Sequence, residues 1–129
     1  MTTSTTRKPT TSELEILHVL WERGPSTVRE VHQALNEKRP MGYTSVLKLM
    51  QIMTAKGTVR RNEEQRAHIY EAVQPEEKTK RQLALDVLQR VFDGSASELM
   101  MHALASRKAS KEEIEEMRQL LNEHERKIR

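Results

Sequence analysis

The helical spacing of the apolar residues stops at Gly57, and this change divides the first half of the chain into helices and strands. Apolar residues recur with helical spacing within residues 12–23, 26–37 and 42–56, which predicts three amphipathic helices. Residues 58–73 have no helical period, and two short apolar runs there flank a charged middle. We therefore predict that a β-hairpin with an exposed, charged loop follows the three helices.

Capping patterns mark the predicted ends of these helices. Residues 12–15 (S-x-x-E) and 27–30 (T-x-x-E) have the spacing of a capping box, in which side chains bond the first backbone N–H groups. The Gly-Pro pair at 24–25 ends the first helix, residues 38–42 form a turn, and Gly57 lies where a left-handed cap is expected. Three helices and a hairpin in this order are the layout of a winged helix-turn-helix.

The third predicted helix has two unlike faces. Turned at 100° per residue, its apolar residues gather on one arc, and the opposite arc holds Thr44, Lys48, Gln51 and Ala55. In a winged helix-turn-helix this helix enters the DNA major groove, where such groups bond base edges or meet a thymine methyl group. The absence of carboxylates from residue 38 to residue 62 suits a surface that meets a polyanion. The alternative is a merely solvated polar face. The predicted DNA contacts of this helix are Tyr43, Thr44, Ser45, Leu47, Lys48 and Gln51.

Three arginines surround the predicted hairpin, which is the wing of such a fold. We predict that Arg60, Arg61 and Arg66 contact phosphates, with a reach into the minor groove as a further role. The alternative is a solvated loop in which two neighbouring glutamates cancel two of these charges. The whole net charge of +3 lies in residues 1–74, where 11 Lys and Arg stand against 8 Asp and Glu. This bias permits nucleic-acid binding without establishing it.

The sequence of the second half of the chain predicts that it pairs with a second copy of itself. Pro75 opens it at a favoured first helical position, and we predict helices over residues 75–93, 95–106 and 110–128. With 36% apolar and 3% aromatic residues in the chain, three short helices cannot bury a large core alone, whereas two copies together can. The alternative is that these helices pack back on the winged helix within one chain. The predicted dimerisation residues are Leu83, Val87, Leu88, Val91, Leu99, Leu104, Ile114, Met117 and Leu121.

The predicted fold class is therefore mainly α with a small β-hairpin, a winged helix-turn-helix followed by a three-helix dimerisation region. We predict a disordered N-terminal arm over residues 1–10, a winged-helix DNA-binding domain over 11–74 and a helical dimerisation domain over 75–129.

The sequence also argues against several classes of function. The chain has no cysteine, which excludes disulfides, thiolate metal sites and cysteine nucleophiles and fits a reducing compartment. Its histidines lack metal-binding spacing and it holds no catalytic motif, so we expect no metal, no cofactor and no enzymatic activity. The N-terminus has no apolar signal region, and no apolar run approaches the roughly 20 residues of a membrane span. We expect a soluble, cytoplasmic protein.

Several motifs, in order and spacing, closely resemble those of the penicillinase-repressor family, the BlaI/MecI-type transcriptional regulators. They are TSELEILHVLW (11–21), GPSTVREV (24–31), GYTSVLKLMQIMTAKG (42–57), RAHIY (66–70) and EEIEEMRQLL (112–121). The resemblance runs from about residue 10 to residue 125 and covers nearly the whole chain.

This resemblance implies a homodimeric repressor of transcription that binds a palindromic double-stranded DNA operator. It also implies inactivation by proteolysis in the dimerisation region, triggered by a membrane-bound sensor, with the corresponding bond near His102–Ala103. Two other hypotheses stay open at this point. The winged helix could be a protein-interaction module, or the protein could be a repressor that senses a small molecule between the wing and the dimerisation helices.

Overall fold

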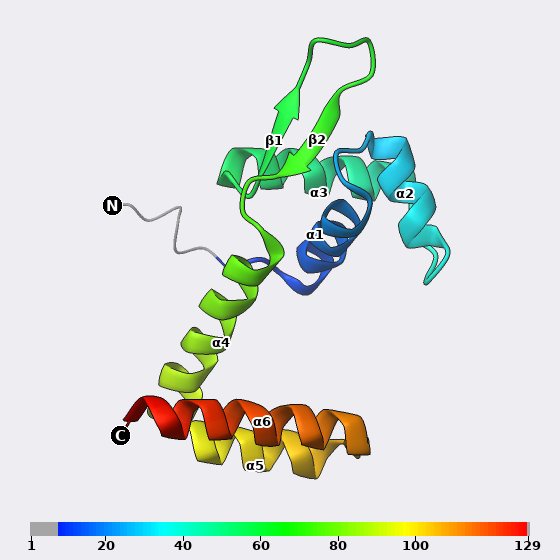
Figure 1. The fold of residues 1–129 in the computed structure, drawn as a ribbon. Helices are drawn as coiled ribbons and strands as arrows, with labels where there is room; N and C mark the ends of the chain where they lie inside the picture. Colours follow the sequence, from blue (N-terminus) through cyan, green and yellow to red (C-terminus); the bar gives the residue numbers. More distant parts are fainter. Residues whose placement is uncertain (1–7, 129) are drawn as a thin grey trace. The chain divides into compact units, whose positions relative to one another are not determined.

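The computed structural model describes residues 8–128, which form two compact units whose division falls within one helix, after Leu83. The elements of these residues are α1 (Thr11–Arg23), α2 (Val28–Asn36), α3 (Tyr43–Lys56), β1 (Val59–Asn62), β2 (Ile69–Ala72), α4 (Glu76–Phe92), α5 (Ala96–Ser106) and α6 (Lys111–Ile128). The predicted fold class, mainly α with one small β-hairpin, is confirmed (Figure 1). Most of the predicted arm over residues 1–10 lies outside the described residues. The domain boundary at Pro75 stays a prediction.

The first helix begins earlier than the sequence pattern predicts. Thr10, and not Ser12, is the cap of α1: its hydroxyl accepts from Glu13 N at 3.2 Å, and its own N–H donates to Glu13 Oε1 at 3.1 Å. The capping box predicted at residues 12–15 is therefore wrong. The observed start places Glu13 where its carboxylate also accepts two hydrogen bonds from Lys56 Nζ, at 2.9 and 3.0 Å. This ion pair joins the first turn of α1 to the last turn of α3.

The caps predicted for the next two helices are confirmed. Thr27 and Glu30 form a capping box at the start of α2, with Glu30 N donating to Thr27 Oγ1 at 3.1 Å. Gly57 ends α3 in the left-handed conformation, with φ of +87°, and its N–H reaches the carbonyl of Met53 at 3.0 Å. A residue with a Cβ atom is strained in that conformation, which explains a glycine at this position.

The hairpin is antiparallel, with Arg60 opposite Glu71 and Arg61 opposite Tyr70. Its base is fixed by Ser26, which lies between α1 and α2 and is buried. Ser26 N donates to Tyr70 O at 2.9 Å, and Tyr70 N donates to Ser26 O at 2.8 Å. Figure 1 shows that the hairpin turn projects away from the three helices, as the wing of a winged helix does.

One apolar core holds the first unit together. It draws on α1, α2, α3 and both strands, so burying it fixes the orientation of α3 and of the wing. Its buried apolar residues are Ile16, Leu17, Val19, Leu20, Val28, Val31, Leu35, Val46, Met50, Met53, Val59 and Tyr70.

The first turns of α4 belong to this unit. Trp21 Nε1 donates to the carbonyl of Gln74 at 2.9 Å, which ties α1 to the segment that leads into α4. Thr79 is buried, and its hydroxyl lies 3.4 Å from Gln74 Oε1. Trp21 is half-buried and packs against the core.

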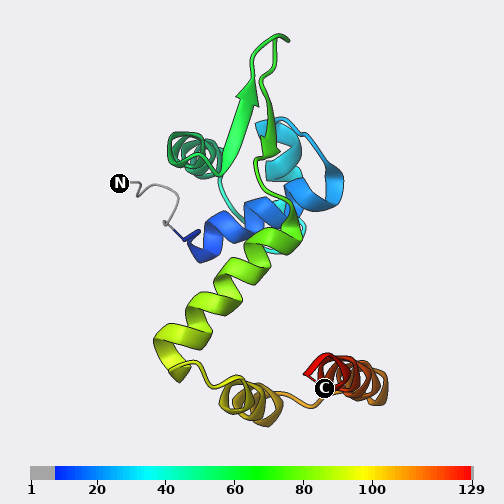
Figure 2. The same ribbon diagram turned by 60° about the vertical axis from the view of Figure 1, so that its left-hand side comes forward.

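The second unit begins at Ala84 and contains the end of α4 together with α5 and α6. Figure 2 shows α5 and α6 nearly end-on. Serines start the two later helices: Ser95 accepts from Glu98 N at 3.2 Å, and Ser110 accepts from Glu113 N at 3.0 Å. None of the described residues in this unit is buried. No helix of residues 8–128 is both long enough and apolar enough to span a membrane.

Candidate DNA-binding surface

The N-terminal end of α3 has free backbone N–H groups and three exposed side chains beside them. Gly42 is its cap and has no side chain, so no side-chain oxygen accepts from the first N–H groups of the helix. Such groups favour an anion, because they are unpaired and lie at the positive end of the helix dipole. Tyr43, Thr44 and Ser45, predicted to contact DNA, are all exposed beside them, and Tyr43 is 46% exposed.

Two side chains of α2 hold the turn that leads into α3. His32 Nε2 donates to the carbonyl of Met41 at 2.7 Å, and Asn36 Oδ1 accepts from Met41 N at 3.0 Å. The edge of the His32 ring also meets the ring of Tyr43, with centroids 5.7 Å apart at 82°. Sequence reasoning missed this clamp, because its partners face each other across a turn and follow no helical spacing.

The outward face of α3 has the composition that the sequence predicts. Thr44, Lys48, Gln51 and Ala55 are all exposed, while Val46, Met50 and Met53 on the opposite arc are buried. Within residues 8–128, Lys48 makes no ion pair, so its ammonium group is available to an outside anion.

Two apolar residues differ from what the sequence predicts for the outward face of α3. Leu47, predicted to meet a thymine methyl group, is half-buried and packs against the core, so it offers only part of its side chain to a partner. Ile52 is 39% exposed on the same arc, next to Gln51, and sequence reasoning did not name it. Its position is readable from the helical period, at 80° from Thr44, but an apolar residue is not an obvious member of a polar face.

The three arginines of the wing differ in their partners. Arg60 Nε donates to Glu71 Oε1 at 3.0 Å, and Arg61 Nε donates to Glu63 Oε2 at 2.7 Å. Arg66 is exposed and makes no ion pair within the described chain. Two of the predicted phosphate contacts are thus already paired with carboxylates of the wing itself.

Arg61 is held more firmly than Arg60. Its hydrogen bond with Tyr70 and then its hydrogen bond with Glu63 raise the pKa of the Arg61 guanidinium above its usual value. Its side chain is 32% exposed, against 62% for that of Arg60. Since a guanidinium is charged at any relevant pH, this difference concerns its freedom to move and leaves its charge unchanged.

The predicted dimerisation residues lie on the surface of a single chain. Val91 and Leu121 are 58% and 59% exposed, and Leu104 and Ile114 are 43% and 39% exposed. The rest of the predicted set, Leu83, Val87, Leu88, Leu99 and Met117, is half-buried. Between α5 and α6 lies an open groove of about 540 Å³. It is lined by Met100, Leu104, Lys108, Ala109, Ile114, Met117, Arg118 and Leu121.

The bond predicted for proteolysis lies inside α5. His102 and Ala103 are exposed, but the carbonyl of His102 accepts from Ser106 Oγ at 2.7 Å, and its ring packs at 5.6 Å from the ring of Phe92. A protease binds its substrate in an extended form, so this segment of α5 would have to unwind before cleavage.

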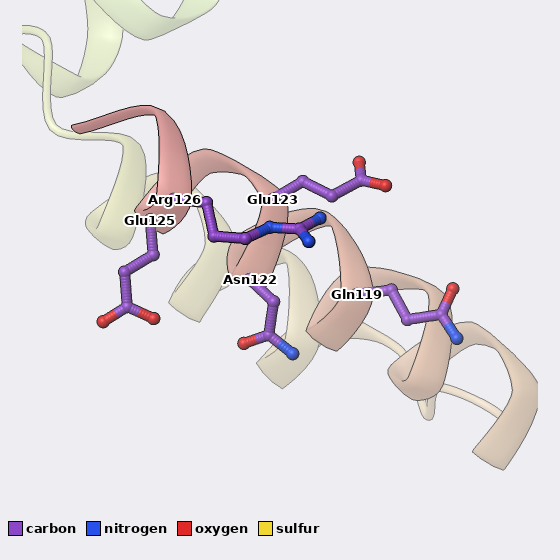
Figure 3. Close-up of a pocket in the computed structure, with 5 residues that line it drawn as sticks. All are labelled: Gln119, Asn122, Glu123, Glu125 and Arg126. Carbon is purple, nitrogen blue, oxygen red and sulfur yellow. The ribbon is translucent and has the colours of Figure 1, made fainter. Parts of the chain in front are cut away.

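No candidate metal site occurs among the described residues. In residues 8–128 no group of three or more His, Cys, Asp or Glu side chains could hold a metal ion. A shallow hollow on α6 is lined by Gln119, Asn122, Glu123, Glu125 and Arg126. Figure 3 shows that these five side chains all come from one helix, and we assign no binding site to them.

The family model and three relatives that match this chain are all described as regulators or repressors. The family model described as "Penicillinase repressor" matches residues 9–123. "Transcriptional regulator BlaI" of Mycobacterium tuberculosis is 34% identical over 92 residues, which cover 70% of this chain and 67% of that protein. "Penicillinase repressor" of Bacillus licheniformis is 24% identical over 113 residues, 88% of each chain. "Methicillin resistance regulatory protein MecI" of Mammaliicoccus sciuri is 20% identical over 111 residues, 86% of this chain and 90% of that one.

Proposed function

Because the chain belongs to the penicillinase repressor family, we propose that it is a transcriptional repressor that binds a palindromic double-stranded DNA operator as a homodimer. One observation carries the proposal: the exposed face of α3 holds Thr44, Lys48, Gln51 and Ala55, within a stretch of sequence free of carboxylates. The family is one of transcriptional repressors, so the activity is binding rather than catalysis. Binding to DNA would locate the protein in the cytoplasm.

The dimensions and chemistry of α3 suit the major groove. With 14 residues the helix is about 21 Å long, and the groove, about 12 Å wide, admits one helix. Gln51 can bond adenine with both ends of its amide, Lys48 can bond guanine or a phosphate, and Ala55 can meet a thymine methyl group. Tyr43, Thr44 and Ser45 would bind the phosphate at the start of the helix, and the arginines of the wing would bind the backbone beside it.

The apolar surface of the second unit supports the homodimer. A single chain leaves Val91, Leu104 and Leu121 between 43% and 59% exposed, which is unusual for so many large apolar residues in one short region. A second copy would cover them and would place two copies of α3 about one turn of DNA apart. The operator would then have the two-fold symmetry of the protein.

Fluorescence anisotropy tests DNA binding directly. A labelled duplex from upstream of the protein's own gene and a scrambled duplex of the same composition are titrated with the protein at several salt concentrations. We expect selective binding to the first duplex and a steep fall of affinity with salt, because each phosphate contact adds about 0.9 to the slope of log affinity against log salt.

Lys48→Ala tests the role of α3 in the same assay. Lys48 makes no ion pair in the described chain, so its loss should leave the fold intact. We expect weaker binding to the operator and an unchanged dimer. Unchanged operator binding would contradict the assignment of α3. Absence of binding to any duplex at low salt would favour the protein-interaction module.

Proteolytic control stays a prediction. We propose that a membrane sensor system leads to cleavage near His102–Ala103, and that local unwinding of α5 comes first, since no described residue of α5 is buried. Mass spectrometry of the protein from induced cells would identify the cleaved bond. Cleavage confined to the segment between α5 and α6 would contradict this location.

A further inference from the structure

We propose that Glu71 masks Arg60 in the wing and thereby sets the overall affinity of this protein for DNA. The inference rests on the proposed function, in which the wing lies along the DNA backbone. Glu71 is assigned as an affinity-setting residue. It would weaken binding to every duplex by a similar factor and leave the choice of sequence to α3.

The geometry of the pair carries this inference. Arg60 and Glu71 lie directly opposite each other in the hairpin register, and Arg60 Nε donates to Glu71 Oε1 at 3.0 Å. Their side chains are 62% and 44% exposed. The guanidinium that would meet a phosphate therefore already has a carboxylate at hydrogen-bonding distance.

An exposed pair of this kind is easily exchanged. Such pairs are weak because water screens both charges, so a phosphate can replace Glu71 as the partner of Arg60. The two residues stay opposite each other in the hairpin, however, so the carboxylate remains within one Debye length, about 8 Å, of that phosphate. Its repulsion would offset much of the attraction that Arg60 supplies.

The other charges of the hairpin provide the comparison. Arg61 is also paired, since its Nε donates to Glu63 Oε2 at 2.7 Å, and its side chain is less exposed than that of Arg60. Glu64 carries the same charge as Glu71 in the same hairpin and forms no ion pair within residues 8–128; its backbone N–H donates to Asn62 Oδ1 at 2.9 Å. Glu64 is therefore the matched control for the charge of Glu71 without its contact.

The test compares Glu71→Gln with Glu64→Gln in the anisotropy assay, on both the operator and the scrambled duplex. We expect Glu71→Gln to raise affinity for both duplexes by about two- to fivefold per wing at 0.15 M salt, the range for one exposed charge pair. It should also steepen the salt slope by about 0.9 per wing, as for one added phosphate contact. Glu64→Gln should raise affinity less. In an Arg60→Gln background, the gain from Glu71→Gln should fall to that of Glu64→Gln.

Two outcomes would overturn the inference. One is an equal gain from Glu71→Gln and Glu64→Gln, which would show an effect of net charge alone. The other is a gain from Glu71→Gln that persists undiminished without Arg60. Lys48→Ala, measured in the same series, separates this inference from the proposed function. If Lys48→Ala weakens binding while the two glutamate variants agree, only the role of Glu71 is wrong.

Discussion

The ion pair between Glu13 and Lys56 offers the sharpest test of how the first unit holds α3 in place. The Glu13 side chain is 3% exposed and that of Lys56 is 17% exposed, so both charges have left most of the solvent. Lys56 Nζ donates to both carboxylate oxygens, and Glu13 also accepts from the N–H of Thr10. Lys56→Met would keep most of the aliphatic stem and remove the charge.

The magnitude follows from burial. Removing one partner of a fully buried ion pair destabilises a protein by about 3–5 kcal/mol, because the remaining charge is left uncompensated. Since Lys56 is partly exposed, water can reach the remaining carboxylate, and we expect a loss of about 2–3 kcal/mol in the free energy of unfolding. Glu13→Gln should lose less, about 1–2 kcal/mol, because Lys56 can turn to solvent.

Urea unfolding followed by tryptophan fluorescence measures this loss. Trp21 is the only tryptophan, and its ring lies half-buried in the first unit. Protein concentration is held constant, because pairing of two chains would make the midpoint depend on it. Lys48→Met is the control: it is the same substitution in the same helix at an exposed residue without an ion pair in the described chain, and it should change stability by less than about 0.5 kcal/mol.

The double variant completes the argument. Glu13→Gln combined with Lys56→Met leaves no buried charge unpaired, so its loss should be about 1–2 kcal/mol smaller than the sum of the two single losses. Strict additivity, or a Lys56→Met midpoint equal to that of Lys48→Met, would refute the view that a buried pair joins α1 to α3.

Three further predictions concern other parts of the chain. Leu121→Asp should give monomers in sedimentation equilibrium and weak operator binding, because it puts a charge on the apolar face of α6, whereas Gln119→Asp should not; a tight Leu121→Asp dimer would exclude α6 from the interface. Gly57→Ala should lower the free energy of unfolding by about 1–2 kcal/mol through its φ of +87° alone, since no atom beyond its two chain neighbours lies within 4 Å of the added Cβ. An unchanged urea midpoint would contradict this. Asn36→Ala should reduce the ratio of operator to scrambled affinity more than it reduces thermal stability, because it frees the backbone of Met41 at the start of α3; an unchanged ratio would leave Asn36 a structural role only.

Much of the first unit could be predicted because its signals are local. Thr27 and Glu30 cap α2 through side chains three positions apart, and Gly57 ends α3 because the required φ suits glycine. The two faces of α3 follow from its helical period alone. Such features depend on neighbours in the sequence, so a single sequence contains them.

The errors and omissions concern contacts between distant residues. Thr10, and not Ser12, caps α1, and in this arrangement Glu13 reaches Lys56, 43 positions away. The His32 clamp on Met41 and the pairing of Arg60 with Glu71 also depend on how elements meet in space. No local pattern distinguishes Arg60, which is paired with Glu71, from Arg66, which has no ion pair in the described chain.

In the second unit, the sequence predicts the helices well, but a single chain does not bury their apolar faces. Its helix ends were predicted well, and Ser95 and Ser110 cap α5 and α6, yet none of its described residues is buried. Local signals thus specify helices whose apolar faces remain without cover in a single chain. In proteins, most of the stability of a helix comes from tertiary packing of its apolar face. If two chains supply that packing, folding of the second unit and formation of the dimer are one event, and any agent that unwinds α5 would also release the operator.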